Sequence, residues 1–374
     1  MTLVELRWTP YAVPFARGFA TAHGGWRMRE GVIVRIVTDR GVVGTGEIAP
    51  LPSHGALPNG GQLSALERIA PHLLGVEIGE LGARIDAALG EGAPYAPLRC
   101  GIETAALDAT ARAAGVSVAT LLSRDAASHV RVNAVIDAAP CAGARAAAAR
   151  AVARGFRDLK LKVGVSRKVA TEEARVAAVR EAAGPAVRLR LDANGAWTEQ
   201  QAIDTIRALE RYGIELVEQP VPPGDAAALR RVREAVRTPV AADESVTGID
   251  AVRALLHARA VDAVVVKLPV VGGPLRALEI ARMAAAAGVD VVVTSAFDAG
   301  IGVAAALHVA AARPRPVTAC GLATLELLED DLIDEGLRID DGDMPVPGAP
   351  GLGVTVDERA LARYATGPER VVRA

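Results

Sequence analysis

The chain has 374 residues, of which 51% are hydrophobic, and its formal net charge is −2 at pH 7. This balance, with no basic block and no aromatic-rich stripe, argues against a nucleic-acid-binding protein. The start MTLVELRWTP lacks an apolar signal core, and no run of about 18 apolar residues is free of charge, so we expect neither a secretory signal nor a membrane span. The three cysteines, Cys100, Cys141 and Cys320, form no CxxC pair and predict a reduced, cytoplasmic protein.

The first third of the chain combines strand patterns with helix patterns. Residues 3–15 and 31–50 are typical of strands, and the DRG sequence at 39–41 predicts a turn inside the second of these segments. Helical periodicity then appears in three segments, residues 62–74, 81–90 and 100–115. Strands followed by helices predict a small α+β domain over residues 1–125.

From Val130 onward, short apolar segments alternate with helical patterns. The expected strands are 132–136, 157–163, 187–192, 214–218, 239–244, 263–267, 289–295 and 317–322. Seven or eight such units predict an α/β domain over residues 126–325 that closes into a barrel of the (β/α)₈ kind, with a doubly wound open sheet as the alternative. The Pro- and Gly-rich segment 326–374 is expected to return to the first domain.

Three acidic residues end successive expected strands: Asp192, Glu218 and Asp243. The steps between them, 218−192 = 26 and 243−218 = 25 residues, are roughly the length of one βα unit. Carboxylates at the ends of neighbouring parallel strands meet in one mouth, where they repel each other unless a cation lies between them. Oxygen ligands suit a hard divalent ion, so we expect Mg²⁺, with Mn²⁺ also possible. A single acid at a strand end is more often a helix cap, but three in register favour a metal site.

Lysines flank these acids on both sides in the sequence. Lys160 and Lys162 lie two apart on one expected strand and therefore share a face, here the barrel interior. Two neighbouring ammonium groups disfavour each other's charge, which predicts a lowered pKa for at least one of them and suits it for proton transfer. Lys267 lies 24 residues after Asp243 and should face the same mouth. For Lys162 and Lys267 we favour catalysis; for Lys160 an ion pair with the acids is nearly as good an interpretation.

Taken together, the sequences KLK, LDANGAW, VEQP, AADES and VVVKLPVVGG resemble the enolase superfamily, in its muconate-lactonizing-enzyme-like subgroup. The resemblance implies a modified (β/α)₇β barrel with an N-terminal α+β capping domain, one Mg²⁺, and removal of a proton α to a carboxylate. It assigns the three acids to the metal, Lys162 and Lys267 to acid–base chemistry, Lys160 to tuning Lys162, and Asn194 and Glu244 to supporting positions. No histidine lies near residues 263–267 or 289–295, which disfavours the mandelate-racemase-like subgroup.

The remaining histidines and the first-domain loops leave several roles open. His257 and His308 fall in helical patterns and are expected to be structural or exposed. His23 and His54 fall in segments that cover the substrate in this family, so each is either a substrate contact or an ordinary loop residue. The same segment around His23 carries Thr21, which we expect to contact substrate, as well as Arg17 and Arg27, for which surface charge is an equally good interpretation.

Residues 294–312 and 319–332 resemble o-succinylbenzoate synthases, which implies a lyase that makes a menaquinone precursor from a small-molecule carboxylate. We expect substrate contacts from Ser295 and Thr294 hydroxyls, from backbone N–H groups at Gly300 and Gly302, and from the open backbone at Gly321. Asp298 and Ala299 replace a Glu-Ser pair common in these enzymes. N-succinylamino acid racemase and muconate cycloisomerase therefore stay open, and dipeptide epimerase is disfavoured because TACGLAT lacks an Asp-x-Asp sequence. A non-catalytic barrel used as a binding protein is the alternative from another class. A homo-oligomer is expected.

Overall fold

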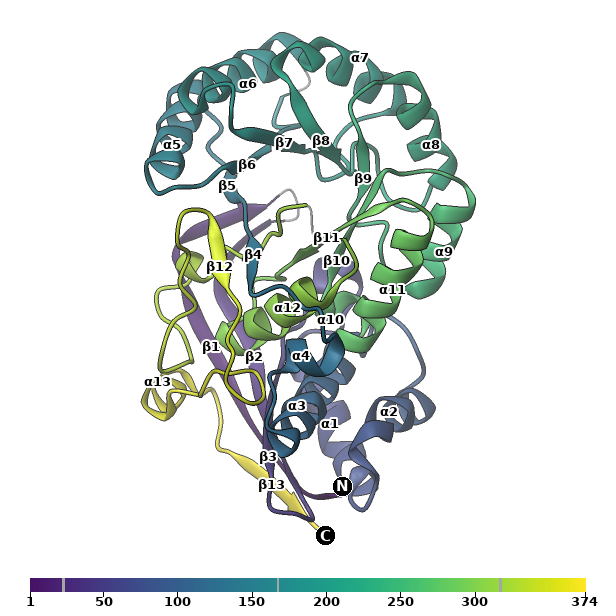
Figure 1. The fold of residues 1–374 in the computed structure, drawn as a ribbon, viewed down its shortest axis with the longest axis vertical. Helices are drawn as coiled ribbons and strands as arrows, with labels where there is room; N and C mark the ends of the chain where they lie inside the picture. The colour runs from purple at the N-terminus through teal and green to yellow at the C-terminus, as the bar shows by residue number, and fades with distance from the viewer. Residues whose placement is uncertain (22–23, 167, 316–317) are drawn as a thin grey trace.

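The protein has two parts, an antiparallel sheet with helices on one side and a larger, curled parallel sheet surrounded by helices (Figure 1). In the computed structural model the backbone is described for residues 1–21, 24–166, 168–315 and 318–374, and side chains within 17–26 are not described. Among the described helices, none combines the length and the apolar character needed to cross a bilayer.

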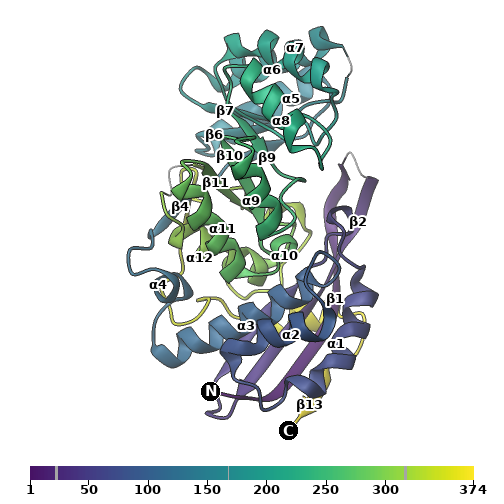
Figure 2. The ribbon, with the colours of Figure 1, turned by 90° about the vertical axis from the view of Figure 1, so that its right-hand side faces the viewer.

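The smaller part is a four-stranded antiparallel sheet in the order β13-β1-β2-β3. Its strands are β1 (Leu3–Thr21), β2 (Gly24–Thr38), β3 (Val43–Ile48) and β13 (Arg370–Arg373). Helices α1 (Asn59–Leu73), α2 (Leu81–Leu89) and α3 (Ala96–Ala114) cover one face of the sheet (Figure 2). Alternating residues such as Val32, Val34 and Ile36 of β2 point to that face and form a buried cluster with the helices. The helices were expected within a few residues of these bounds.

The larger part is a parallel sheet in the order β11-β10-β9-β8-β7-β6-β5. Its strands are β5 (Ala134–Ile136), β6 (Asp158–Lys162), β7 (Arg188–Asp192), β8 (Ile214–Glu218), β9 (Val240–Ala242), β10 (Ala263–Lys267) and β11 (Asp290–Thr294). The helices are α4 (Val118–Leu122), α5 (Cys141–Ala153), α6 (Val169–Ala183), α7 (Glu199–Leu209), α8 (Ala226–Ala235), α9 (Ile249–His257), α10 (Leu268–Val271), α11 (Pro274–Ala286) and α12 (Gly300–Ala312). Strands such as β10, with the sequence AVVVK, are apolar on both faces because helices cover the outside and side chains fill the inside.

Residues 319–321 close the parallel sheet into a barrel. On one side Gly321 N–H donates to Val293 O at 2.9 Å, and on the other Asn133 N–H donates to Cys320 O at 3.0 Å. This segment forms bridges rather than a full strand, so the eighth position is shorter than the strand expected at 317–322, of which residue 317 lies outside the described backbone. The fold is the expected modified barrel with an N-terminal α+β domain, and closure excludes the open doubly wound sheet.

The last fifty residues run beside both parts. Strand β12 (Asp343–Pro345) pairs with β4 (His129–Arg131), and helix α13 (Glu358–Tyr364) precedes β13, which pairs antiparallel with β1. Single-turn helices η1 (Pro52–His54), η2 (Ile78–Glu80), η3 (Glu210–Tyr212) and η4 (Leu325–Leu327) complete the chain. Of these, η1 and η4 border the barrel mouth, so residues from both ends of the sequence reach the same cavity.

Candidate active site at the barrel mouth

Three carboxylates meet at the carboxyl ends of neighbouring barrel strands. Asp192 is the last residue of β7, Glu218 is the last residue of β8, and Asp243 follows β9 directly. Each offers one oxygen, and these oxygens lie within 4.8 Å of one another. All three side chains are buried. Because ionised carboxylates this close in a dry site repel each other strongly, the arrangement requires positive charge beside it, and its all-oxygen donor set is the kind that Mg²⁺ and Mn²⁺ prefer.

Three lysine ammonium groups supply positive charge to the carboxylates. Lys160 Nζ lies 2.8 Å from an oxygen of Asp192 and 2.6 Å from an oxygen of Glu218. Lys162 Nζ donates to Asp192 at 2.6 Å, and Lys267 Nζ donates to Asp243. Strands β6 and β10 carry these lysines on either side of the strands that carry the acids, so Lys162 and Lys267 flank the three carboxylates.

The electrostatic balance in this cluster differs from the sequence expectation for the lysine pair. Burial lowers the pKa of Lys160, but the charges of Asp192 and Glu218 outweigh burial and raise that pKa above its ordinary value. The expected lowering of a pKa by the neighbouring ammonium is therefore wrong for Lys160, because the carboxylates dominate its surroundings. Burial and the charge of Asp192 raise the pKa of Glu218 to about 8. For Asp192 itself, burial is outweighed by Lys160 and Lys162, which hold its pKa below the ordinary range.

Asn194 and Glu244 form a second set of contacts behind the cluster. Asn194 accepts a hydrogen bond from Lys162 Nζ at 2.8 Å through Oδ1 and donates to Glu244 Oε1 at 2.9 Å through Nδ2. Its φ of 44° lies in the left-handed region, which Asn tolerates better than most residues. Burial and the charge of Asp243 raise the pKa of Glu244. These contacts fix the direction in which the ammonium of Lys162 points.

A cavity opens between the mouth of the barrel and the smaller domain. Its lining includes Leu51, Ser53 and His54 from the smaller domain and, from the barrel, Asn133, Val135, Asp137, Lys160, Lys162, Asn194, Asp243, Glu244, Lys267, Thr294, Ser295, Phe297, Gly321, Ala323, Thr324 and Leu327. The cavity therefore combines ammonium and carboxylate groups at the ends of β6 to β10 with apolar and hydroxyl groups, and Asp137 adds a further carboxylate beyond β5. Such a combination suits a small anionic molecule with an apolar body.

Some of the residues expected to contact substrate line the cavity and others do not. Ser295, Thr294 and Gly321 line the cavity, although a side chain at 321 would collide with Thr294 Oγ1 at 2.3 Å, so glycine there serves packing as well. The side chains of Thr21, Arg17 and His23 lie outside the described residues. Arg27 is exposed, and His54 lines the cavity.

Two further histidines with sequence-based expectations, His257 and His308, lie away from the cavity. His308 is fully buried in α12, where Nδ1 accepts a hydrogen bond from Ala119 N–H at 3.1 Å, and burial lowers its pKa. His257 ends α9 and is exposed. Both positions fit the expectation of structural or exposed histidines.

The expectation for Gly300 and Gly302 needs correction. Their backbone N–H groups are engaged by carboxylates of the protein itself: Gly300 donates to Asp331 Oδ1 at 2.7 Å, and Gly302 donates to Glu47 Oε2 at 2.8 Å. Neither glycine lines the cavity. The start of α12 is an anion site, as expected from the sequence, but its anions come from within the chain.

A buried cluster that no sequence pattern predicted holds the start of α12. Glu47 of β3 accepts hydrogen bonds from Tyr11 Oη at 2.6 Å and from Ala299 N–H at 2.8 Å. Asp298 accepts from Ala296 N–H at 2.9 Å and lies 4.0 Å from Arg29. Burial and the charge of Asp298 raise the pKa of Glu47 to about 7. Because Asp298 supports the loop from behind and does not line the cavity, its departure from the Glu-Ser pattern concerns packing rather than direct substrate contact.

Two family models match the chain. One, described as "Mandelate racemase / muconate lactonizing enzyme, N-terminal domain", covers residues 4–123, and the other, described as "Enolase C-terminal domain-like", covers residues 143–360. Among similar proteins, the L-Ala-D/L-Glu epimerase of Bacillus subtilis (strain 168) is 33% identical over 366 residues, 95% of this chain and 97% of the relative. The o-succinylbenzoate synthase of Thermobifida fusca (strain YX) is 40% identical over 241 residues, 64% of this chain and 72% of the relative.

A third relative and two solved structures extend the likeness. Chloromuconate cycloisomerase CbnB of Cupriavidus necator is 31% identical over 374 residues, 97% of each chain. The dipeptide epimerase from Cytophaga hutchinsonii, complexed with Mg and the dipeptide D-Ala-L-Val, matches with a TM-score of 0.91 and 26% identity, over 100% of both chains. The N-succinyl Arg/Lys racemase from Bacillus cereus ATCC 14579 matches with a TM-score of 0.93 over 100% of both chains, and at 24% identity this likeness concerns the fold.

Proposed function

The chain belongs to the enolase superfamily, in its muconate-lactonizing-enzyme-like group, and from this premise we propose that it removes a proton from the carbon α to a substrate carboxylate. The observation that carries the proposal is the cluster of Asp192, Glu218 and Asp243, flanked by Lys162 and Lys267 on the two neighbouring strands. Such a proton is far too weakly acidic for a lysine alone, so the reaction needs strong stabilisation of the negative charge that develops.

The three carboxylates fit a bound divalent metal. They are buried, they offer only oxygen, and three ammonium groups already compensate their charge, so the site is built to hold positive charge. We propose that Asp192, Glu218 and Asp243 hold one Mg²⁺, or Mn²⁺ in its place. When bound, the metal supplies positive charge that stabilises an enediolate.

The lysines divide the remaining work according to their surroundings. Lys162, held by Asp192 and Asn194, is proposed as the base that takes the α-proton. Lys267 faces the mouth from the other flank and is proposed to serve as the second acid–base group or as a fixed positive charge beside the enediolate. Lys160 contacts two carboxylates, which raise its pKa, so it stays charged and acts on the site electrostatically rather than as a base.

The substrate that we favour is the cyclohexadiene carboxylate whose dehydration gives o-succinylbenzoate, a menaquinone precursor. In this reaction Lys162 takes the α-proton and, once protonated, assists the departure of hydroxide, so the ring becomes aromatic. Support comes from the similarity to the synthase of Thermobifida fusca and from the apolar side chains of Leu51, Val135 and Phe297 in the cavity. The chain would then be a carbon–oxygen lyase.

Racemization or epimerization is the second candidate, because Lys162 and Lys267 can serve opposite faces of the α-carbon and the epimerase of Bacillus subtilis is similar over nearly the whole chain. The missing Asp-x-Asp sequence at residues 321–323 favours N-succinylamino acids over dipeptides, and Asp137 is the cavity-lining carboxylate near that wall. Cycloisomerization of muconates is supported by the third relative. A non-catalytic binding protein is the weakest interpretation, because every expected acid and lysine is present.

Domain bounds, a cellular setting and a partner can also be proposed for the protein. We propose a capping domain over 1–125, a barrel over 126–325 and a returning segment over 326–374, and the β13–β1 pairing supports the last of these. The three cysteines are free, which supports a reduced cytoplasmic setting. A small-molecule carboxylate is the proposed partner, within a homo-oligomer.

One panel of substrates tests the proposed function. Purified protein with Mg²⁺ is given the cyclohexadiene, N-succinyl amino acids, dipeptides and muconate, and kcat/KM is compared. Efficient dehydration of the cyclohexadiene, with slower racemization of N-succinyl amino acids, is the expected result. Fast dipeptide epimerization or muconate cyclization without dehydration would overturn the substrate assignment. Loss of an α-deuterium label into water from any substrate tests the proton-abstraction step independently of the product.

A further inference from the structure

Asn133 is a buried polar side chain that the chemistry above does not use. It precedes β5, is 2% exposed, and lines the cavity. Its backbone N–H is engaged by Cys320 O, but its amide nitrogen Nδ2 has no hydrogen-bond partner within the described part of the chain. A buried amide donor without a partner costs free energy, so such a group in a binding cavity points to a ligand atom that completes it.

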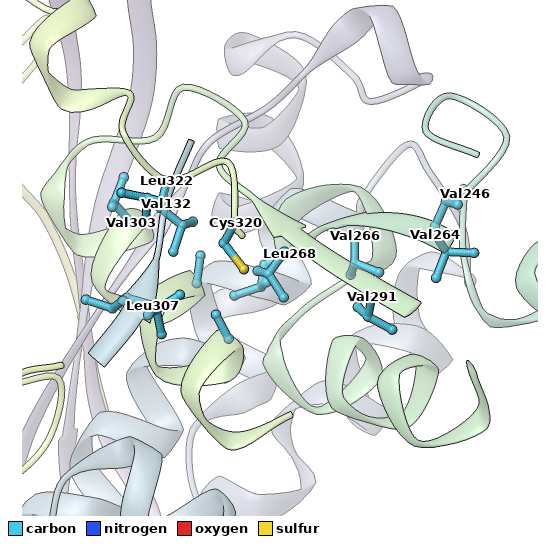
Figure 3. Close-up of a cluster of buried hydrophobic side chains, with 14 of the residues drawn as sticks. Val132, Val246, Val264, Val266, Leu268, Val291, Val303, Leu307, Cys320 and Leu322 are labelled. Carbon is cyan, nitrogen blue, oxygen red and sulfur yellow. The ribbon is translucent and has the colours of Figure 1, made fainter. Parts of the chain in front are cut away.

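The alternation of side chains at the barrel closure directs Asn133 inward. The neighbouring residues Val132 and Cys320 are fully buried in the core outside the barrel, together with Leu307 of α12 (Figure 3). Because successive side chains on a strand point to opposite faces, Asn133 and Gly321 face the barrel interior. The side chain at 133 therefore enters the cavity at the seam where residues 319–321 meet β5.

The strand order places this seam across the barrel from the carboxylates. The acids lie on β7, β8 and after β9, whereas β11, residues 319–321 and β5 form the opposite wall. On that wall, Thr294 Oγ1 already donates to Gly321 O at 2.9 Å, Val135 and Ala323 are apolar, and Asp137, directly after β5, adds an exposed carboxylate. Ser295 Oγ accepts from Asp298 N–H and from Thr324 Oγ1, which leaves its own hydrogen for a ligand. Asn133 and Ser295 thus supply hydrogen-bond donors to this wall.

We infer that Asn133 is a specificity-determining residue. Its amide donates a hydrogen bond to an oxygen on the part of the substrate that points away from Asp192, Glu218 and Asp243. This inference rests on the proposed function. The chemical class is a carbonyl or carboxylate oxygen; a hydrocarbon arm leaves the donor unpaired, and an ammonium has no lone pair to accept it. A site built around such a donor rejects analogues that lack the oxygen.

The test uses the shape-conserving variants Asn133→Leu and Asn133→Asp, with Asn59→Leu as a control at a buried asparagine outside the cavity lining. For the best substrate of the panel, we expect Asn133→Leu to lower kcat/KM by about tenfold to a hundredfold, mainly through KM, because the substrate oxygen loses its donor. Asn133→Asp should lose at least as much, since it presents an acceptor to an acceptor. Asn59→Leu should leave kcat/KM unchanged.

Inhibition constants locate the oxygen. The probes are o-succinylbenzoate, the analogue with a methylene in place of its keto group, and the butyryl analogue without the terminal carboxylate. We expect Asn133→Leu to weaken o-succinylbenzoate but not the analogue that lacks the contacted oxygen. If the panel selects N-succinyl amino acids, the matched probes are their N-butyryl counterparts. Equal weakening of all probes would show a structural role, and no weakening would show no contact; either result overturns the inference. The proposed function is judged on wild-type turnover, so the two failures remain distinct.

Discussion

Two of the buried carboxylate clusters in the described part of the protein compensate their charge by different means. At the barrel mouth, Asp192, Glu218 and Asp243 are matched by the ammonium groups of lysines. At the contact between the smaller domain and α12, Glu47 is matched by a tyrosine hydroxyl and by backbone N–H groups of the helix start. Burial raises the pKa of a carboxyl group in both places, to about 8 for Glu218 and to about 7 for Glu47.

The two clusters differ in what their partners allow. The carboxylates at the barrel mouth form a candidate site, whereas Glu47 forms a joint, by which we mean the contact between the smaller domain and the start of α12. Lysine ammonium groups lie at the ends of flexible chains, so they can move when a metal or substrate arrives. Backbone N–H groups of a helix are fixed, so Glu47 can only hold α12 and the loop 295–299 against the smaller domain. A shifted carboxyl pKa alone therefore does not identify a catalytic site. The mobility of the groups that contact the carboxyl group, and its access to the cavity, distinguish a catalytic site from a structural contact.

The largest expected effect is the loss of activity when a carboxylate at the barrel mouth is replaced. Glu218→Gln removes one charge and one oxygen of the proposed metal set, and we expect kcat/KM to fall by about four orders of magnitude at ordinary Mg²⁺ levels. Circular dichroism and thermal melting should show an intact fold. Retention of a tenth of wild-type activity, or unchanged Mg²⁺ binding in calorimetry, would contradict the metal assignment. The matched variant Glu47→Gln, at a buried carboxylate outside the cavity lining, should leave Mg²⁺ binding unchanged.

The next effect concerns the proposed base. Lys162→Ala should lower kcat by about a thousandfold, because it removes the group proposed to take the α-proton. Washout of an α-deuterium label into water measures this step directly. A variant that keeps a tenth of the wild-type washout rate would reject the role. If the chain racemizes, Lys267→Ala should stop washout from one enantiomer and Lys162→Ala from the other.

A smaller effect, on the free energy of unfolding, is expected when Glu47 at the joint is replaced. Glu47→Leu leaves the N–H groups of Ala299 and Gly302 and the hydroxyl of Tyr11 without their acceptor, so the free energy of unfolding should fall by about 2–4 kcal/mol. Chemical denaturation measures it. Tyr11→Phe removes one of these contacts and should cost less. A Glu47→Leu protein as stable as wild type would show that the joint contributes nothing.

The smallest effect is a pH dependence of stability. The pKa of Glu47 is about 7 in the folded protein against 4.5 in the unfolded chain, so the folded state binds more protons between these values. The contribution of this group to the free energy of unfolding should therefore be fully present below pH 4.5 and be lost as the pH rises to about 7. Glu47→Gln, which cannot titrate, should show a flatter profile over this range. A profile identical to that of wild type would assign the dependence to other groups.

The sequence predicted the barrel and the mouth well because both depend on local order. Strand ends repeat at regular steps, so the positions of Asp192, Glu218 and Asp243 in the sequence already imply that they meet. The bridging segment 319–321 was expected as a longer strand, because its apolar pattern does not reveal that only a few of its residues pair.

The joint could not be predicted because it depends on contacts between distant parts of the chain. Glu47 meets Ala299 and Gly302 across about 250 positions, and no local pattern links them. The N–H groups of Gly300 and Gly302 were assigned to substrate for the same reason: the sequence shows a helix start but not which anion occupies it. The raised pKa of Lys160 likewise depends on distances to two carboxylates that only the folded barrel fixes.

The pairing of β13 with β1 has a consequence for biosynthesis. Strand β1 and its partner at 370–373 stand side by side in one sheet, yet the whole barrel is translated between them. On the ribosome, β1 must therefore wait with one edge unpaired until the barrel has emerged, and an exposed strand edge is a site of wrong association. Arg7 places a charge on this edge of β1, which suits a strand edge that is exposed before it pairs.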